Sequence, residues 1–376
     1  MRLNKLPDTF VKHKVTVPLG DRSYEIMIGP GVLSEVHIPL NALFTNNAFY
    51  VICDSNCHDL LGLDLETMLR GHGLQVECIS FQEGEQSKNL STVETICREL
   101  VKKGADRTSV ILALGGGVTG DIAGFVASIY MRGIPFVQIP TTLLAQVDSS
   151  VGGKTGVDLP EGKNLVGTFY QPRLVLADIA TLATLPNHEL KNGLAEVVKY
   201  GAIWDSEFFC FLEDHAQACL ELEPDVIAQV VRRSCEIKAE VVSRDEREGG
   251  LRRILNFGHT IGHAIEAASN FTVSHGQAVS IGMVAAARLS CQKGYLSAHE
   301  VSRLKHLLET LELPTELPQG ISHRALLSLI KHDKKAQKGR VHFVLLKGIG
   351  ETIITPEISD QEILNAMEGG KAGLIE

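Results

Sequence analysis

Residues 109–121 read Ser-Val-Ile-Leu-Ala-Leu-Gly-Gly-Gly-Val-Thr-Gly-Asp, and this stretch decides the fold class. Its first half is an apolar run of buried-strand length, and a helix is expected over residues 119–131. Backbone N–H groups at a helix N-terminus suit a pyrophosphate, and glycines let the chain approach it closely. Gly115, Gly117 and Gly120 match the pattern G-x-G-x-x-G. Alone, that match is equally typical of a tight turn from a strand into a helix.

Strand and helix signals alternate on both sides of this stretch. The expected strands cover residues 15–19, 24–28, 48–53, 74–79, 109–114, 134–139 and 174–177. The first two are separated by Gly-Asp and are expected to form a hairpin. Such alternation predicts a parallel sheet with helices on both faces.

The pattern changes near residue 180. Helices are expected over residues 189–201, 206–220, 224–245, 256–268, 277–294 and 297–311, and two short strands over 341–346 and 352–354. The sequence therefore predicts a Rossmann-like α/β domain, residues 1–180, followed by a mainly α-helical domain, residues 181–376.

Composition narrows the class of protein. The chain has 376 residues and a net charge of −9, which argues against a general binder of nucleic acid or of anionic membranes. It has no apolar run of the length that a signal peptide or a membrane span needs. Its eight cysteines form no C-x-x-C pair. Reduced thiols in a cytoplasmic protein are the expectation.

Polar residues follow several of the expected strands. Asp54 follows one strand, 83–88 (Glu-Gly-Glu-Gln-Ser-Lys) follows the next, and 140–142 (Pro-Thr-Thr) follows a third. Because the carboxyl ends of parallel strands meet at one edge, these segments and the glycine loop are expected to line one crevice. The glycine loop lies well inside the domain, and Asp54, which could hold an adenine ribose, lies upstream of it. The sequence thus predicts a nucleotide site.

Three histidines and a carboxylate suggest a metal site. His259 and His263 are spaced i and i+4 on one helix, and His275 precedes the next helix. Glu196 is flanked by apolar residues, and a buried carboxylate is costly unless it is paired or bound to metal. Imidazoles with one carboxylate are typical of catalytic zinc. Spacing alone does not choose three ligands among these four residues.

Cations gather in otherwise apolar or glycine-rich settings. They are Lys154, Lys163, Arg173, Lys199, Lys238, Arg252 and Lys347. A surface loop rich in lysine is usually only solvated, and 152–155 (Gly-Gly-Lys-Thr) lacks the G-x-x-x-x-G-K-[ST] spacing of a phosphate loop. So many cations in an acidic protein suggest a substrate with more than one negative charge, such as a phosphate and a carboxylate.

Taken together, the motifs resemble the 3-dehydroquinate synthase family of sugar-phosphate cyclases. The resemblance runs in order from about residue 11 to about residue 368. It rests on residues 115–121 (GGGVTGD), 140–154 (PTTLLAQVDSSVGGK), 162–169 (GKNLVGTF), 195–201 (AEVVKYG), 245–248 (DERE), 255–263 (LNFGHTIGH) and 275–279 (HGQAV).

The resemblance implies roles for individual residues. Glu196, His259 and His275 would hold Zn²⁺ or Co²⁺, which leaves His263 to contact substrate. NAD would be bound by Asp54, Asn56, Glu85, Lys88, Gly115, Gly116, Gly117, Val118, Asp121, Thr141 and Thr142, together with Lys154 and Lys163. Substrate would be surrounded by Asp148, Lys154, Asn164, Lys199, Lys238, Arg252, Asn256, His263 and Lys347. Arg132 would help to bind its phosphate, from the partner subunit of a homodimer.

The implied reaction converts 3-deoxy-D-arabino-heptulosonate 7-phosphate into 3-dehydroquinate and phosphate, a step of the shikimate pathway to aromatic amino acids. It proceeds by transient oxidation by NAD, phosphate elimination, re-reduction and intramolecular aldol closure. Two alternatives remain at this point, another sugar-phosphate cyclase and a metal-dependent polyol dehydrogenase of related fold. Lys238 with Arg252 favours an acid substrate over the first, and the number of cations argues against the second.

Overall fold

The structure is a computed structural model that describes residues 13–336 and 341–368. Its contacts divide the chain into two compact units, Met1–Pro186 with Pro224–Ser243, and Asn187–Glu223 with Arg244–Glu376. The single boundary predicted near residue 180 does not describe helix α8 (Pro224–Arg244), most of which joins the first unit. The reason is side-chain contact, because Cys235 Sγ bonds the Gln146 carbonyl oxygen and Lys238 pairs with Asp148.

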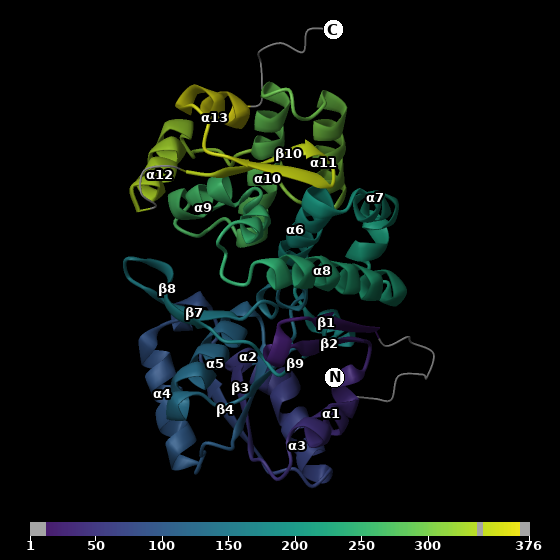
Figure 1. Cartoon of the computed structure of the whole chain (residues 1–376), viewed down its shortest axis with the longest axis vertical. Coiled ribbons are helices and arrows are strands. Elements are labelled where there is room, and N and C mark those ends of the chain that lie inside the picture. Colours follow the sequence, from purple (N-terminus) through teal and green to yellow (C-terminus); the bar gives the residue numbers. More distant parts are fainter. Residues whose placement is uncertain (1–12, 337–340, 369–376) are drawn as a thin grey trace. The chain divides into compact units, whose positions relative to one another are not determined.

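A seven-stranded sheet organises the first unit (Figure 1). In spatial order its strands are β1 (His13–Val17), β2 (Tyr24–Gly29), β9 (Leu174–Asp178), β6 (Phe136–Pro140), β5 (Val110–Gly115), β3 (Phe49–Asp54) and β4 (Val76–Phe81). Strand β1 pairs antiparallel with β2, and every other pair is parallel. The chain runs outward from β3 to β4 and then returns to the other side of β3 as β5. The topological switch point, where such sheets bind ligands, therefore lies between β3 and β5.

Helices cover both faces of this sheet, as predicted. Val51 and Leu112 belong to the core beneath α1 (His37–Leu43) and α3 (Leu63–Gly71), and their neighbours Ile52 and Ile111 belong to the opposite core. The latter is closed by α4 (Leu90–Lys102) and α5 (Gly117–Ile129). Alternate residues of a strand point to opposite faces, so a strand buried on both sides reads as a continuous apolar run. The predicted class of fold is confirmed.

A hairpin stands where the sequence indicated a glycine-rich loop. Strands β7 (Lys154–Leu159) and β8 (Gly162–Phe169) pair antiparallel as a separate two-stranded sheet. A Cβ atom at Gly167 would lie 2.1 Å from the carbonyl oxygen of Thr155, so the two backbones meet only because this residue is glycine. Glycine is depleted in strands, which is why residue preferences missed the hairpin.

Helices dominate the second unit (Figure 1). They are α6 (Asn187–Trp204), α7 (Ser206–Leu220), α9 (His259–Ala268), α10 (His275–Gln292), α11 (Ala298–Thr310), α12 (His323–Ala336) and α13 (Asp360–Met367). Strands β10 (Phe343–Gly348) and β11 (Glu351–Thr355) form a hairpin. Helix α10 is central, since it packs against α6, α9, α11, α13 and β10.

Helix α9 begins at His259, three residues later than predicted, because Gly258 takes the left-handed conformation with φ +80°. This turn brings α9 close to α10. A Cβ atom at Gly282 of α10 would lie 2.0 Å from the Gly258 carbonyl oxygen, so a side chain at that position would push the two segments apart. The close approach carries the histidines of both helices toward α6.

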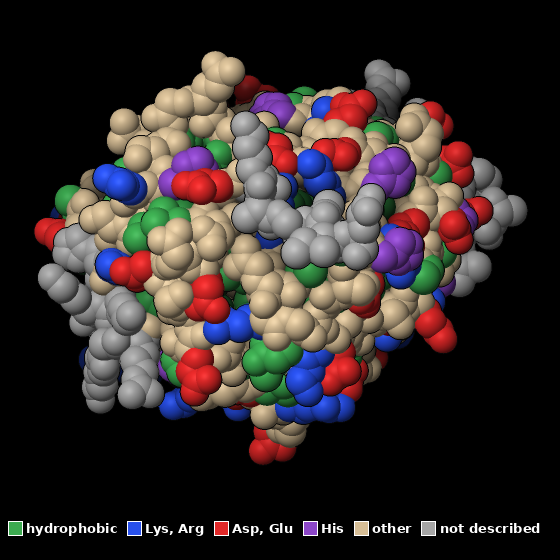
Figure 2. Space-filling model, turned by 90° about the horizontal axis from the view of Figure 1, so that it is seen from above, with side chains coloured by type: hydrophobic (Ala, Val, Ile, Leu, Met, Phe, Trp, Pro, Cys, Tyr) green, Lys and Arg blue, Asp and Glu red, His purple; other side chains and the backbone are tan. Residues whose placement is uncertain are grey.

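Acidic and basic side chains are interspersed over the face of the molecule that Figure 2 displays. Among the residues that the structure describes, the helices are too short or too polar to cross a membrane. All eight cysteines are free thiols, and Cys53, Cys57, Cys219 and Cys235 are buried.

Asp178, at the end of β9, ties the sheet to the segment after β2. Its carboxylate accepts hydrogen bonds from the backbone N–H groups of Gly31 (2.9 Å), Leu33 (3.0 Å) and Ala180 (2.9 Å), and the residue is 2% exposed. Asp178→Ala is expected to lower the free energy of unfolding by about 2–4 kcal/mol, because three backbone donors, that of Leu33 buried and the other two partly buried, lose a charged acceptor. Urea denaturation followed by circular dichroism measures this. Asp64→Ala, at an exposed position of α3, is the control and should change stability by less than about 0.5 kcal/mol.

Candidate active site

The predicted nucleotide residues gather at the carboxyl edge of the sheet. Asp54 ends β3, and the loop after β5 runs through Gly115 and Gly116 into α5. The N–H of Thr141, just beyond β6, donates to the Gly115 carbonyl oxygen at 2.9 Å, so the ends of the two strands are joined. The carboxylate of Asp54 accepts from the Cys57 N–H at 2.8 Å and from Thr119 Oγ1 at 3.1 Å. The acidic residue is thus fixed beside the first turn of α5 at the switch point.

Helix α5 begins at this edge with residues that are half-buried. Gly116 is its N-cap residue, and Gly117 and Val118 open its first turn. A side chain at Gly116 would meet the Thr142 methyl group, since a Cβ there lies 3.1 Å from it. The first N–H groups of a helix have no partner within the helix and favour an anion. This geometry agrees with a bound pyrophosphate.

Four predicted residues beside this edge form two ion pairs within the same unit. Lys88 Nζ lies 2.6 Å from Asp121 Oδ2, and the Lys88 side chain is 7% exposed. Lys163 Nζ, on the β7–β8 hairpin, lies 3.9 Å from Glu85 Oε1. Asn56 is exposed on α2 (Ser55–Cys57), next to Asp54.

The anion-binding candidates of the first unit lie on α8 and on the segments from the end of α5 to β8. Lys238 Nζ lies 2.8 Å from Asp148 Oδ1 and also donates to the Asp148 carbonyl oxygen at 2.5 Å. Lys154 begins β7 and is exposed, and Asn164 on β8 donates its N–H to Asp158 at 2.7 Å. Arg132 is exposed in a turn in which Met131 and Arg132 both have positive φ, 50° and 69°. Such strain in non-glycine residues is typical of functional positions.

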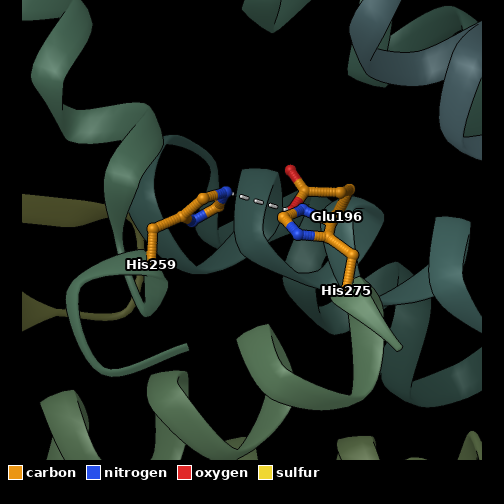
Figure 3. Close-up of side chains that lie close together, drawn as sticks. All are labelled: Glu196, His259 and His275. Carbon is orange, nitrogen blue, oxygen red and sulfur yellow. Dashed lines mark ion pairs between the residues drawn. The ribbon is translucent and has the colours of Figure 1, made fainter. Parts of the chain in front are cut away.

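The second unit brings three of the four metal candidates together. Glu196 Oε1 lies 3.6 Å from Nε2 of His259 and 3.6 Å from Nε2 of His275, and Figure 3 shows both rings turned toward the carboxylate. The three ligand atoms lie within 4.8 Å of one another. Tetrahedral coordination with bonds of about 2.0–2.1 Å separates ligand atoms by about 3.4 Å. The donor set and its spacing therefore fit Zn²⁺ or Co²⁺.

His259 and Glu196 also form contacts through the atoms that face away from the triad. His259 Nδ1 lies 3.1 Å from the Phe257 carbonyl oxygen, which leaves Nε2 to face Glu196. The second oxygen of Glu196 bonds the ammonium of Lys199, one turn along α6, and both side chains are buried. Lys199 thereby lies next to the triad.

Burial and nearby charges shift the pKa values of His259 and His275 in opposite directions. Burial lowers the pKa of His259 to about 3, so its imidazole is neutral. Burial also disfavours a proton on His275, but contacts with Glu196 and Glu266 outweigh it and raise the pKa of His275 to about 10. A divalent ion bound at Nε2 would take the place of the proton that faces Glu196, so metal binding would release that proton, while the Nδ1 proton that faces Glu266 would remain.

His263 remains outside the triad. Its side chain is 63% exposed, and Nε2 lies 4.0 Å from Glu266 Oε2. Sequence spacing had left open that His263 replaces one of the other histidines beside Glu196. The structure instead brings His259 and His275 to Glu196. Glu266 was not predicted. It is 5% exposed in an apolar stretch, and the argument from a costly buried carboxylate that singled out Glu196 applies to it equally.

The remaining predicted residues lie after α8 and on β10. Arg252 is 2% exposed, and its N–H donates to Asp245 Oδ2 at 3.0 Å, so the carboxylate of Asp245 folds the loop that carries it. Asn256 Nδ2 donates to Glu248 Oε1 at 3.0 Å, a partner that the sequence did not single out. Lys347 on β10 is exposed and lies 3.5 Å from Glu351.

Two solved structures share this architecture. One is 2-epi-5-epi-valiolone synthase from Streptomyces hygroscopicus with NAD⁺ and Zn²⁺ bound, 32% identical with a TM-score of 0.86, over 93% of this chain and 97% of that one. The other is 2-deoxy-scyllo-inosose synthase with carbaglucose-6-phosphate, NAD⁺ and Co²⁺, 31% identical with a TM-score of 0.87, over 95% and 100%. The fold and the site thus define the class as the sugar-phosphate cyclases.

Sequence relatives narrow the class. Residues 78–192 match the model of the 3-dehydroquinate synthase N-terminal region, and residues 193–336 match that of its C-terminal region. The 3-dehydroquinate synthases of Symbiobacterium thermophilum and Thermodesulfovibrio yellowstonii are each 47% identical, over 93% of this chain and 98% of their own. The chain belongs to the 3-dehydroquinate synthase family, which confirms the resemblance inferred from its motifs.

The buried pair of Lys88 and Asp121 gives a pH-dependent prediction. Burial raises the pKa of Asp121, and the ammonium of Lys88 opposes that rise. In Lys88→Met the opposing charge is lost, so the folded-state pKa of Asp121 rises further above its unfolded value of 3.8. The free energy of unfolding of the variant is therefore kept at low pH and falls as pH rises through the folded-state pKa of Asp121.

Urea denaturation at pH 5 and at pH 8 measures this effect. Lys88→Met is expected to lose about 3 kcal/mol relative to the wild type at pH 8 and less at pH 5. The double variant Lys88→Met/Asp121→Asn removes both charges and is the control. A stability loss in Lys88→Met that is the same at both pH values would contradict the interpretation.

Proposed function

We propose that the chain is an NAD- and metal-dependent enzyme that converts 3-deoxy-D-arabino-heptulosonate 7-phosphate into 3-dehydroquinate and phosphate. The observation that carries the proposal is the triad of Glu196, His259 and His275, whose ligand atoms converge in a chain of this family. The two solved cyclases contain NAD⁺ and either Zn²⁺ or Co²⁺ by their descriptions, which supports the same pair of cofactors here.

Glu196, His259 and His275 would hold the divalent ion. The ion supplies Lewis-acid stabilisation of negative charge on substrate oxygens. Lys199 contributes a positive charge at the second oxygen of Glu196. It would limit how far that carboxylate neutralises the ion, and it would hold the carboxylate in one orientation. His263, exposed beside the triad, would contact substrate and not the ion.

NAD would lie along the carboxyl edge of the sheet. Its pyrophosphate would face the N-terminus of α5 at Gly116 and Gly117, and Asp54 would accept hydrogen bonds from a ribose. The remaining contacts would come from Asn56, Glu85, Lys88, Gly115, Val118, Asp121, Thr141, Thr142, Lys154 and Lys163. Bound there, NAD would supply reversible hydride transfer and would not be consumed.

The substrate has a phosphate and a carboxylate, and both need cations. Lys154, Lys238 and Arg252 would bind these two anions. The other substrate contacts would come from Asp148, Asn164, Lys199, Asn256 and Lys347. Lys238 is held in place by Asp148 and Arg252 by the Asp245 loop, so little side-chain freedom is lost when an anion binds. Arg132, presented by its strained turn, would bind phosphate from the partner subunit of a homodimer.

The alternatives differ in what they release. Another sugar-phosphate cyclase would also release phosphate, but from a substrate without a carboxylate, so it would not need Arg252 and Lys238. A polyol dehydrogenase would release no phosphate and would accumulate NADH. Eight free thiols, four of them buried, agree with a reducing compartment, and we place the enzyme in the cytoplasm on that ground.

Turnover is expected to be redox-neutral. Phosphate should be released one for one with 3-dehydroquinate at catalytic NAD, because the hydride taken from substrate is given back within the same turnover. Absorbance of NADH and free phosphate, measured in one cuvette with substrate well above enzyme, tests this. Steady NADH accumulation without phosphate would favour the dehydrogenase.

Metal dependence can be tested at the ligands. Prolonged chelation is expected to abolish activity, and Zn²⁺ or Co²⁺ to restore it. Glu196→Gln, His259→Ala and His275→Ala should lose the ion by elemental analysis, whereas His263→Ala should retain it and turn over slowly. If His263→Ala loses the ion and His275→Ala keeps it, the ligand set is wrong.

A further inference from the structure

His275 is held from two sides by residues that are not among the proposed ligands. We propose that Asn192 and Glu266 are positioning residues that set the metal affinity of the triad through His275. Asn192 fixes the backbone on either side of this histidine, and Glu266 fixes its imidazole ring. The inference rests on the proposed metal site and concerns how that site is built.

Asn192 clamps the start of α10 onto α6. Its Oδ1 accepts a hydrogen bond from Ser274 Oγ at 2.6 Å and another from the Gly276 N–H at 3.2 Å, and the residue is 5% exposed. These donors belong to the residues immediately before and after His275. Asn192 also lies one turn before Glu196 on α6, so a single helix holds both the carboxylate ligand and the backbone of the histidine that faces it.

The packing at Gly276 enforces this clamp. A Cβ atom at Gly276 would lie 2.4 Å from the Cα of Asn192 and 2.7 Å from its carbonyl oxygen. Contact at that distance requires glycine, so the first turn of α10 rests directly on the backbone of α6. The position of His275 relative to Glu196 is therefore set by backbone contact as well as by its own side chain.

Glu266 acts on the ring. Its Oε2 lies 3.5 Å from His275 Nδ1, while Nε2 of the same ring lies 3.6 Å from Glu196 Oε1. A carboxylate on the Nδ1 side keeps the proton on that nitrogen and directs the Nε2 lone pair toward the ion. Glu266 is itself held, because its backbone carbonyl accepts from the Phe271 N–H at 2.8 Å and from Ser269 Oγ at 2.9 Å.

The same carboxylate also lies near His263, and this raises a competing arrangement. His263, Glu266 and His275 offer ligand atoms within 4.8 Å of one another, which would suit a second ion bridged to the first through the His275 ring. In our assignment His275 Nδ1 carries a proton, so this nitrogen does not coordinate a second ion. The chain should therefore bind one ion, and two ions per chain would overturn the role of Glu266.

The test measures metal affinity of the full-length chain directly. Metal-free protein is titrated with Zn²⁺ against a competing chelator, and with Co²⁺ while its absorption spectrum is followed. Glu266→Gln and Asn192→Leu are expected to bind about 10- to 100-fold more weakly than the wild type. The Co²⁺ spectrum of Glu266→Gln should also change, because the ring is free to rotate in the ligand sphere.

Two pairs of variants separate positioning from general destabilisation. Ser274→Ala removes a helix N-cap that bonds Asn192, and Ser297→Ala removes the corresponding N-cap of α11, which like that of α10 forms a capping box. Ser274→Ala should weaken metal binding and Ser297→Ala should not. Glu316→Gln, which breaks an ion pair with Arg288 in the same unit, is the control for Glu266→Gln.

Thermal unfolding of the metal-free variants completes the design. If Glu266→Gln and Ser274→Ala lower the melting temperature but bind Zn²⁺ like the wild type, the two residues are structural and the inference fails. If Glu196→Gln binds Zn²⁺ like the wild type, the metal site itself is misassigned, which is a different failure. Loss of affinity in Glu266→Gln and Ser274→Ala, with the controls unchanged, supports the proposal even where Asn192→Leu fails to fold.

Discussion

The carboxylate of Glu196 lies inside a helical unit at 1% exposure, and the rest of that unit accommodates it. An isolated buried carboxylate costs several kcal/mol, so every oxygen needs a cation or a donor. One oxygen of Glu196 bonds Lys199, and the other faces Nε2 of His259 and of His275. Each of the helices α9 and α10 opens with one of these histidines, so the first turns of both helices supply partners to this carboxylate.

In both units, buried lysines form ion pairs with carboxylates. The pairs are Lys88 with Asp121, Lys238 with Asp148, and Lys199 with Glu196. Such pairs contribute less to stability than their proximity suggests, because desolvation offsets much of the attraction. Their benefit is positional, since a lysine that is already ordered loses little entropy when it meets an anion. A protein of net charge −9 can thus present ordered cations to an anionic substrate.

The segments at the carboxyl edge of the large sheet differ from the familiar dinucleotide fingerprint for a topological reason. The glycine loop follows β5, whereas the acidic residue Asp54 ends β3, which precedes it in the chain. The two strands are neighbours because the chain leaves β3 for β4 and then returns to the other side of β3. Asp54 and the glycine loop therefore meet at the switch point, even though Asp54 precedes the loop in this chain and the acidic residue follows the loop in the familiar fingerprint.

Local patterns in the sequence determined most of the fold. Apolar runs of strand length identified every strand of the large sheet, and helical periodicity identified α5, α6 and α10 to within a few residues. The motifs that the chain shares with the family indicated it and, through it, a predicted ligand set of Glu196, His259 and His275. These features are readable because period and spacing are properties of the chain itself.

Tertiary structure decided what depends on contacts between distant segments. The β7–β8 hairpin forms through backbone approach at glycines, which carry no strand signal. Helix α8 joins the first unit through contacts of Cys235 and Lys238 with segments about ninety residues away. The roles of Asn192 and Glu266 follow from their distances to Ser274, Gly276 and His275, and no spacing rule places them there. The sequence specified which residues must be buried or charged, and packing decided which of them meet, because a buried polar group is satisfied only by partners that the folded chain brings to it.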